Sequence, residues 1–278
     1  MFLRNTNLEN NSWIIMEKNY LLKIILLILT CVSVNQAQEI PELITDRPDQ
    51  TKSPNVVPID FVQIETGFVY QKQKYSEGTN TLENENLMLA STLCRYGVNS
   101  FTELRFGGEY FYGQSFSNGL KSDLQGMQNL LFGAKFQLRK NQKILSNIGI
   151  ILQTILPFGN ETLRPANFSP VLLFCFDQQI NEDFLFGCNL GTESVDNSGN
   201  YSAIYSGFLG YCATNKLGLF FEIYGDAING SEPSNNLDCG ITYQFRQNVQ
   251  VDFSLGTTLK GGITDLFGGF GISVRLPK

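Results

Sequence analysis

One pattern fills the chain from about residue 59 to its end, where apolar and polar residues alternate in stretches closed by turns. In the first stretch one face carries Val62, Ile64 and Phe68, and the opposite face carries Gln63 and Glu65. Successive side chains of a β-strand point to opposite faces, so this period of two predicts strands with one apolar and one polar side. Alternating stretches of about ten residues are typical of strands in transmembrane barrels.

Twelve such stretches follow one another, at residues 59–72, 84–97, 101–114, 124–139, 144–158, 169–178, 183–195, 200–213, 217–228, 235–246, 249–260 and 266–276. An even number of strands is typical of single-chain bacterial barrels. The sequence therefore predicts an all-β fold, a closed antiparallel up-and-down transmembrane β-barrel of about 12 strands, preceded by a cleaved signal helix.

The connections between these stretches alternate in length. Tight turns are expected at residues 98–100, 140–143, 180–182, 214–216 and 247–248, and longer loops at 73–83, 114–123, 159–168, 196–199 and 227–234. Short periplasmic turns and long external loops are the rule for outer-membrane barrels. Alternation alone does not say which face points outward, so a soluble β-sandwich or a periplasmic barrel with an apolar interior is the alternative.

Aromatic residues at the ends of the stretches support a membrane location. Amphipathic rings prefer the level where the membrane meets water. We expect an outer group and an inner group at these two levels, namely Tyr70, Tyr112, Phe158, Tyr201 and Tyr224 outside and Tyr96 and Tyr211 inside. The apolar side of each stretch is then expected to contact lipid, and the charged side to line an enclosed interior.

The only long apolar run lies near the start, at residues 21–34, after Lys18 and around Lys23. A basic start, a short apolar core and a small residue at Ala37 predict a secretory signal peptide over residues 1–37. The core is shorter than the roughly 20 apolar residues that a spanning helix needs. Met16 is a candidate for the true start, because residues 1–15 add nothing to such a signal.

Between the signal and the first strand lies a polar segment, residues 38–58, that we call the strap. It contains Pro41, Pro48, Pro54 and Pro58, and proline at this density does not join a sheet interior. One hypothesis is a partial plug, in which Asp46, Arg47 and Asp49 fold into the periplasmic mouth and pair with charges of the lumen. The alternative is a disordered leader before a barrel that occupies residues 59–278.

The composition excludes several classes of function. The chain has no His, and the familiar outer-membrane barrel enzymes use His as a base or proton shuttle. We therefore expect no enzyme activity, no catalytic residue, no cofactor and no metal site. Net charge is −6 with no basic run, which argues against nucleic acid as a partner. The five cysteines beyond the signal do not suggest a disulfide framework and are expected to face lipid as small apolar residues.

The charged faces of the predicted strands give candidates for lumen-lining residues, and the strap gives candidates for a plug. They are Asp46, Arg47, Asp49, Glu65, Arg95, Glu103, Arg105, Lys135, Glu222, Asp238, Asp252 and Arg275. Opposite charges on neighbouring strands can pair and fill the lumen. They can also tune the selectivity of a water-filled path. Mixed signs fit both interpretations.

Several motifs occur in a fixed order: residues 44–51 (Ile-Thr-Asp-Arg-Pro-Asp-Gln-Thr), 63–67 (Gln-Ile-Glu-Thr-Gly), 93–97, 103–105, 133–135, 189–191 and 222–226. In this order and spacing the chain resembles outer-membrane β-barrel proteins of the phenol-degradation meta-pathway family, which are transporter-like and common in Bacteroidetes-like bacteria. The resemblance covers nearly all of residues 39–278. It implies a bacterial outer-membrane location and a porin-like role. The final Arg275-Leu276-Pro277-Lys278 departs from the terminal aromatic that barrels often carry.

Two functions remain open from the sequence. The first is a channel or transporter for small solutes, with hydrophobic or aromatic compounds as one class. The second is a non-transporting structural or surface-display barrel, which a lumen tightly blocked by ion pairs would favour. The expected partners are outer-membrane lipids, the barrel-assembly machinery and an unidentified small solute.

Overall fold

The computed structural model describes residues 41–77, 80–117, 120–140, 146–194, 200–228, 231–259 and 263–276. The predicted signal peptide, residues 1–37, lies outside these ranges. The described chain contains twelve strands: β1 (Val62–Glu77), β2 (Asn80–Asn99), β3 (Thr102–Ser117), β4 (Leu120–Arg139), β5 (Asn147–Ile155), β6 (Ser169–Gln179), β7 (Phe184–Ser194), β8 (Tyr201–Cys212), β9 (Leu217–Ile228), β10 (Ser234–Arg246), β11 (Val249–Thr258) and β12 (Ile263–Leu276).

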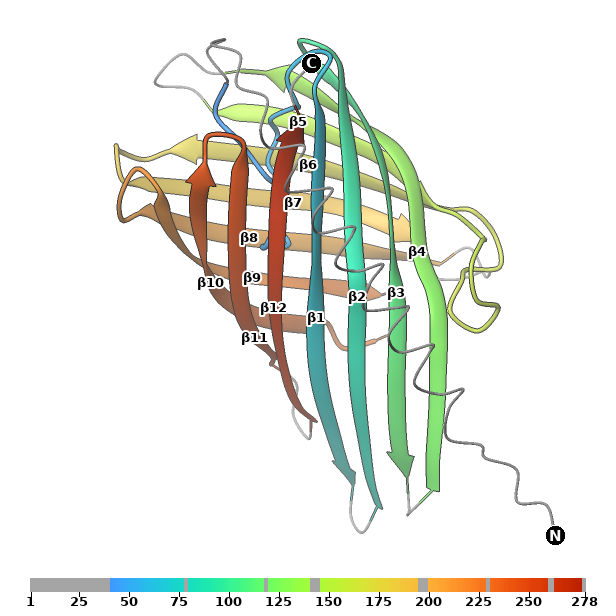
Figure 1. Ribbon diagram of the computed structural model, residues 1–278. Helices are drawn as coiled ribbons and strands as arrows, with labels where there is room; N and C mark the ends of the chain where they lie inside the picture. The colour runs from blue at the N-terminus through green and yellow to red at the C-terminus, as the bar shows by residue number, and fades with distance from the viewer. Residues whose placement is uncertain are drawn as a thin grey trace, which may run out of the picture. The chain divides into compact units, whose positions relative to one another are not determined.

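The twelve strands form one closed antiparallel barrel in sequence order (Figure 1). Closure comes from β1 and β12, which pair from Val62 opposite Leu276 to Tyr75 opposite Ile263. A closed sheet has no free edge, so its backbone N–H and C=O groups are paired internally, as hydrocarbon requires. The predicted fold is confirmed, and every predicted stretch overlaps one strand.

The strands differ in length more than the sequence suggested. β1 to β4 are 16 to 20 residues long, whereas β5 is 9 residues long. Two predicted long loops, 73–83 and 114–123, are wrong, because the hairpins β1–β2 and β3–β4 continue through them. On the first hairpin, Lys72 pairs with Glu85 at 2.7 Å and Lys74 with Glu83 at 3.0 Å across the strands. Such exposed cross-strand pairs support a polar hairpin.

The long half of β4 extends beyond its neighbour. β4 pairs with β5 only from Leu131 to Arg139, so Leu120 to Leu130 have no partner on β5. The connection between β5 and β6 covers part of this edge, since Asn160 N–H donates to the Met127 carbonyl at 2.9 Å. Gly159 in that connection has φ +112°, and a Cβ there would lie 2.4 Å from the same carbonyl oxygen.

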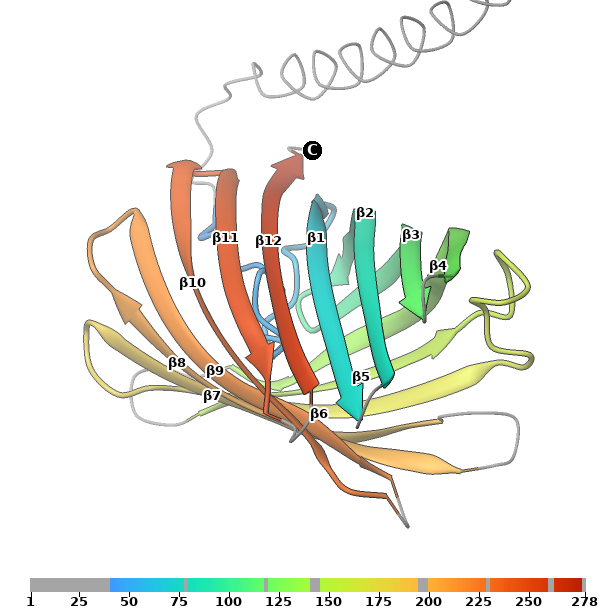
Figure 2. The same cartoon turned by 90° about the horizontal axis from the view of Figure 1, so that it is seen from below.

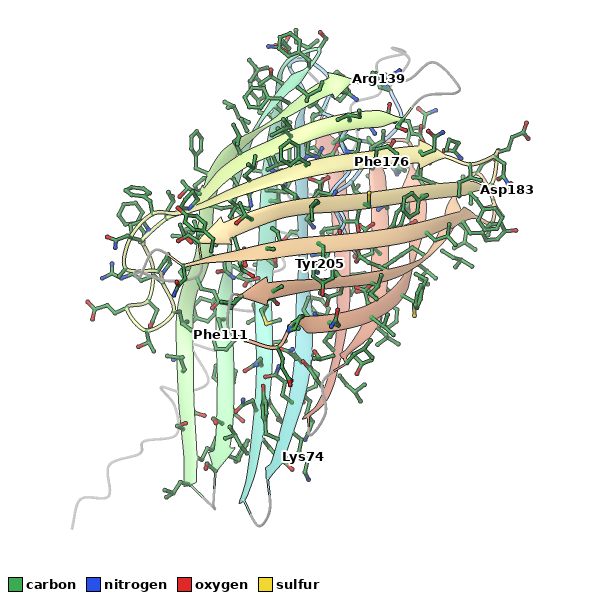
Figure 3. All side chains as sticks on the ribbon, turned by 180° about the vertical axis from the view of Figure 1, so that it is seen from behind. Lys74, Phe111, Arg139, Phe176, Asp183 and Tyr205 are labelled. Carbon is green, nitrogen blue, oxygen red and sulfur yellow. The ribbon has the colours of Figure 1, made fainter. Side chains whose placement is uncertain are left out.

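The two faces of the wall differ sharply in chemistry. Outward side chains include Phe106 and Phe221, which are 55% and 53% exposed, whereas the inward Glu65 and Lys135 are 0% exposed. Figure 3 shows side chains projecting from both faces of the wall. A wall with apolar residues outside and charged residues inside is the architecture of a transmembrane barrel and not of a soluble sandwich. Within the described residues, no helix is long and apolar enough to cross a membrane.

Three inward positions correct the simple rule that apolar sides face lipid. Tyr224 was expected at the outer interface, but it lines the lumen together with Glu222, two positions earlier on β9. Cys175 was expected to face lipid, but it is buried on the inward face of β6. Ile151 on β5 is inward and only 1% exposed. All three residues occupy inward positions of the two-residue period, and this position decides which way they face, although their side chains are apolar or aromatic.

Candidate functional site: a strap inside the lumen

The strap lies inside the barrel and not below it. Its described part, residues 41–58, runs through the ring of strands without joining it (Figure 2). Asp46, Thr51, Pro54 and Val57 are buried along its length. It ends where Asp60 N–H donates to the Gly97 carbonyl at 2.8 Å, just before β1 begins. The prolines remove backbone donors that could otherwise pair with the wall.

Asp46 lies in a basic cluster that we define as Arg95, Arg105 and Lys135. Its carboxylate is 2.6 Å from Arg105 Nη1, 2.9 Å from Lys135 Nζ and 3.8 Å from Arg95 Nη1. Burial alone would raise the pKa of Asp46, but the three cations hold that pKa well below its usual value. The strap thus contributes a fixed negative charge to a positively charged part of the wall.

Two wall carboxylates complete this cluster. Glu65 on β1 is 2.7 Å from Arg95, and Glu103 on β3 is 2.9 Å from both Arg95 and Arg105. Both carboxylates also accept backbone N–H groups of the strap, from Asp46 at 2.9 Å and from Val57 at 2.8 Å. Three cations therefore face three carboxylates, one of them supplied by the strap. Buried charges are normally paired and hydrogen-bonded in this way.

On the opposite side of the lumen the strap is held by Glu222. One carboxylate oxygen accepts the Gln50 N–H at 2.7 Å, and the other accepts the Thr51 N–H at 2.6 Å and the Thr51 hydroxyl. The Asn189 side chain accepts the Lys52 N–H through Oδ1 at 2.6 Å and donates through Nδ2 to the Lys52 carbonyl at 2.9 Å. Carboxylates that accept several N–H groups make strong, well-oriented contacts.

Arg47 lies in a notch made by two glycines. Gly67 on β1 and Gly271 on β12 are directly opposite each other, and both face the lumen. A Cβ at either position would lie 2.5 Å from Arg47 Nη2. The guanidinium then reaches Asp252 on β11 at 3.2 Å. Glycine is required here because the strap side chain passes so close to the wall.

Arg275 fixes the beginning of the described strap. Its guanidinium donates to the carbonyls of Pro41 at 2.8 Å and Glu42 at 2.9 Å, and to Gln63 Oε1 at 3.1 Å.

The structure places all twelve candidate residues in the lumen. Ten are buried, Arg47 and Asp49 are half-buried, and eleven of the twelve contact the strap or belong to it. Asp238 is the exception, since the structure gives it no hydrogen bond to the strap.

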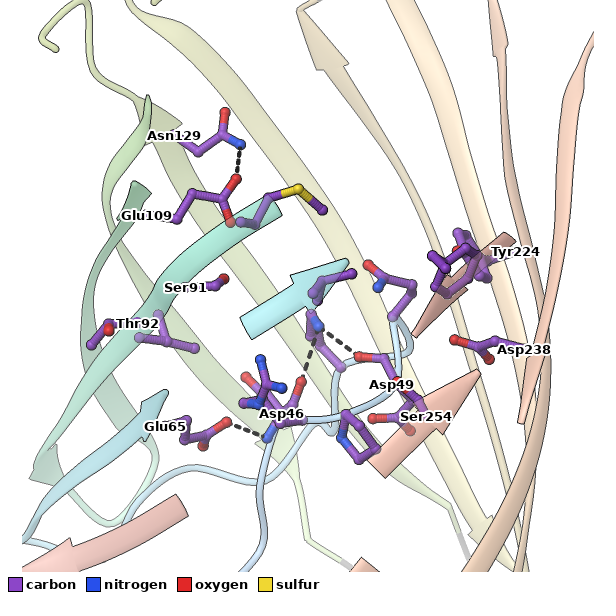
Figure 4. A pocket seen from close by; sticks show the side chains of 18 of the residues that line it. Asp46, Asp49, Glu65, Ser91, Thr92, Glu109, Asn129, Tyr224, Asp238 and Ser254 are labelled. Atoms are coloured by element: carbon purple, nitrogen blue, oxygen red, sulfur yellow. Dashed lines mark hydrogen bonds between the residues drawn. The ribbon is translucent and has the colours of Figure 1, made fainter. Parts of the chain in front are cut away.

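The strap divides the interior into cavities at the two ends. Toward the end with the short turns lies a cavity of about 640 Å³, which reaches Asn181 in the β6–β7 turn. Toward the other end, which we call the loop end, lie two adjoining cavities of about 440 and 600 Å³. Figure 4 shows side chains that line the first of them. Asp49 lines the 640 Å³ and 440 Å³ cavities, and Lys52 lines all three. The strap is therefore the partition between the two ends.

Part of the loop-end lining is apolar, which charge patterning could not reveal. The 600 Å³ cavity is lined by an aliphatic patch, defined as Leu131, Ile151, Ile155, Val171, Leu173 and Ile204. These residues occupy inward positions of β4, β5, β6 and β8. The available signal was a run of consecutive apolar residues at 150–152 of β5 and 171–176 of β6, which is typical of strands with apolar groups on both faces. No group of three His, Cys, Asp or Glu in the described ranges is arranged to hold a metal ion.

Solved structures with the same fold include membrane barrels. The COG4313 outer membrane channel from Pseudomonas putida F1 is 14% identical, with a TM-score of 0.60 over 80% of this chain and 97% of that chain. The transport unit of the autotransporter AIDA-I from Escherichia coli is 10% identical, with a TM-score of 0.51 over 86% of this chain and 94% of that chain. At these identities the likeness concerns the fold. No curated protein matches the chain.

The family comparison agrees with the motifs in the strap and the strands. A family model matches residues 45–276, which includes the strap from Thr45 onward and every strand of the barrel. The resemblance found in the sequence is thereby confirmed. The chain belongs to the family described as "Putative MetA-pathway of phenol degradation".

Proposed function

We propose that this protein is an outer-membrane channel for small solutes whose lumen is narrowed by its own N-terminal strap. The observation that carries the proposal is the pair of interior spaces, one at each end of the barrel, that meet at Asp49 and Lys52 of the strap. A barrel that only displayed loops would not need water-sized space on both sides of a thin partition. Both barrel termini lie at one end, and the long β5–β6 connection lies at the other; we assign the end with the termini to the periplasm, because the longer loops of this class of barrel are external.

The lining of the loop-end cavities favours solutes with an apolar part. Besides the aliphatic patch, polar groups such as Asn189 and Asn236 line the 600 Å³ cavity. Ligand cavities commonly combine an apolar wall with a few placed polar groups. A small aromatic or aliphatic molecule with one polar group fits this lining better than a sugar with hydroxyls on every side.

The same strap supports a second candidate, a barrel that is permanently closed. The ion pairs of Asp46 with the basic cluster are buried and short, and Glu222 binds the strap on the opposite wall. Such contacts open only if the strap moves as a unit. The two candidates differ in the conductance that they predict for the barrel with its strap and for the barrel without it.

Electrical conductance in planar bilayers separates them. We compare the full chain with a variant lacking residues 41–58 and with the double variant Glu222→Gln, Thr51→Ala, which loosens one attachment and keeps the strap. We expect small, flickering openings for the full chain, larger steady openings for the deletion and an intermediate record for the double variant. Folding is checked by migration of unheated and heated samples in gels. Full closure of the intact chain together with uptake failure in liposome swelling would support the structural barrel instead.

A further inference from the structure

The loop-end cavity contains a carboxylate that the chain itself leaves without a partner. Asp238 on β10 is 3% exposed and lines the 440 Å³ cavity. Neither of its carboxylate oxygens has a hydrogen-bond partner in the described chain, and no described Lys or Arg lies within ion-pair distance. Buried polar groups are normally satisfied, and an unpaired buried charge is strongly unfavourable.

The nearby donors are already engaged elsewhere. Glu222 is directly opposite Asp238 across β9 and β10, and the strap occupies both of its oxygens. Lys52 Nζ donates to the carbonyls of Asp46 at 3.0 Å and Asp49 at 2.9 Å. Arg47 is turned toward Asp252. Within the described chain the neighbouring Glu222 carboxyl is thus the one group left beside Asp238, and a cationic partner for Asp238 has to come from the contents of the cavity.

An aromatic ring lies beside this carboxylate. Phe267 on β12 lines the same cavity. A Cβ at Gly256 would lie 2.1 Å from Phe267 Cζ and 2.7 Å from Asp238 Cβ, so the glycine leaves room for ring and carboxylate side by side. Figure 4 shows Asp238 on one side of the pocket and Glu109 on the other. A carboxylate next to an aromatic face suits an ammonium group, through charge and through the electron-rich ring.

We propose that the loop-end cavity binds a small organic cation, with its ammonium group at Asp238 and its apolar body against Phe267. The lining also includes Val69 and Met88, which favour an organic ligand over a hydrated inorganic ion. As a binding site this requires only the cavity. A role of this site in transport rests on the proposed channel function, so the test measures the binding of the cation and not its transport.

Calorimetric titration of the purified full chain in detergent tests the site with benzylammonium as the probe and benzyl alcohol as its uncharged counterpart. Charge-assisted contacts predict that benzylammonium binds about ten- to a hundredfold more tightly. Asp238→Asn should remove most of this preference, and Phe267→Leu should weaken benzylammonium about two- to fivefold. The matched control is Glu109→Gln, which lies in the same cavity but is already bonded by Gln128 and Asn129 at 2.9 and 2.8 Å. It should bind as the unmodified chain does.

Two results would overturn the proposal. Equal affinity for benzylammonium and benzyl alcohol would mean that Asp238 is neutral, for example by sharing a proton with Glu222. An equal loss in Asp238→Asn and Glu109→Gln would mean general attraction by an acidic interior. If Asp238→Asn does not fold, the preference of the unmodified chain for benzylammonium and the weaker binding of benzylammonium by Phe267→Leu still decide the question. Binding without conductance would refute the channel and leave the site, whereas conductance without binding would do the reverse.

Discussion

At the residue scale, Asp46 is the strap side chain whose substitution should lower the free energy of unfolding most. Its carboxylate offsets one of the three charges of the basic cluster, where Arg105 and Lys135 lie within 2.9 Å. Asp46→Asn keeps the size of the side chain but leaves a buried excess positive charge. Removing one partner of a buried ion pair typically destabilises by about 3 to 5 kcal/mol. Urea unfolding in lipid vesicles should show a loss of this size.

Asp49→Asn is the matched control for that loss. Asp49 is a half-buried strap carboxylate three residues away, and it forms no ion pair within the described chain. Its substitution should change the free energy of unfolding by less than about 1 kcal/mol. Equal losses for the two variants would mean that the strap responds to total charge and not to the particular contacts of Asp46.

The residues of the lumen were predictable one strand at a time, but their partners were not. The period of two places Glu103, Arg105 and Lys135 on inward faces without any knowledge of the fold. Asp46 meets Arg105 and Lys135 across 59 and 89 residues of sequence, and no local pattern encodes that distance. The plug hypothesis named Asp46, Arg47 and Asp49 because of their charges, without identifying their partners. The aliphatic patch was missed because charge was taken as the sign of an inward face.

At the scale of elements, the strap and the wall meet most closely at the glycine notch around Arg47. Gly271→Ala would push a methyl group into the guanidinium, which lies within 2.5 Å of the new atom and can move away. The Arg47 contact with Asp252 would be lost, and a hydrogen bond between charged groups contributes about 1.5 to 3 kcal/mol. Cleavage of the strap by trypsin after Lys52 should therefore become roughly tenfold faster or more, because it follows the open population.

Gly207→Ala is the control for this substitution. A Cβ there would have its nearest contact at 3.9 Å, with Ile223 Cγ2, which is an ordinary distance. Its trypsin cleavage should match that of the unmodified chain. Unchanged cleavage in Gly271→Ala would show that the Arg47 contact does not hold the strap in place.

Strand positions were predictable, whereas strand ends and irregularities were not. The alternation marks the middle of each strand, but the polar ends of β1 and β2 were predicted as loop, because the contact of Lys74 with Glu83 across the strands is not visible in a local pattern. A register shift between Leu89 and Thr92, with Ala90 at φ +48°, changes which residues of β2 face inward. A bulge of this kind adds one residue to one strand, so a strict period of two cannot anticipate it.

At the scale of the whole molecule, the barrel separates two environments that share one wall only one residue thick. Leu152 on β5 is 49% exposed on the outside, whereas its neighbour Gln153 faces the loop-end cavities. The two positions are adjacent on one strand and lie opposite the adjacent Leu172 and Val171 on β6, so their depths in the membrane are nearly equal. The same substitution made at both positions therefore compares the medium outside the wall with the medium inside it.

Arginine at these two positions is expected to change the free energy of unfolding by different amounts. Leu152→Arg places a charge in hydrocarbon, which destabilises transmembrane barrels by about 2 to 4 kcal/mol near the bilayer midplane. Gln153→Arg places the same charge in a polar cavity, where lumen substitutions mainly tune selectivity. Urea unfolding in lipid vesicles should therefore show a loss for Leu152→Arg that exceeds the loss for Gln153→Arg by at least about 1 kcal/mol. A larger loss for Gln153→Arg would mean that the apolar face packs against protein and that the wall does not divide lipid from a water-filled lumen.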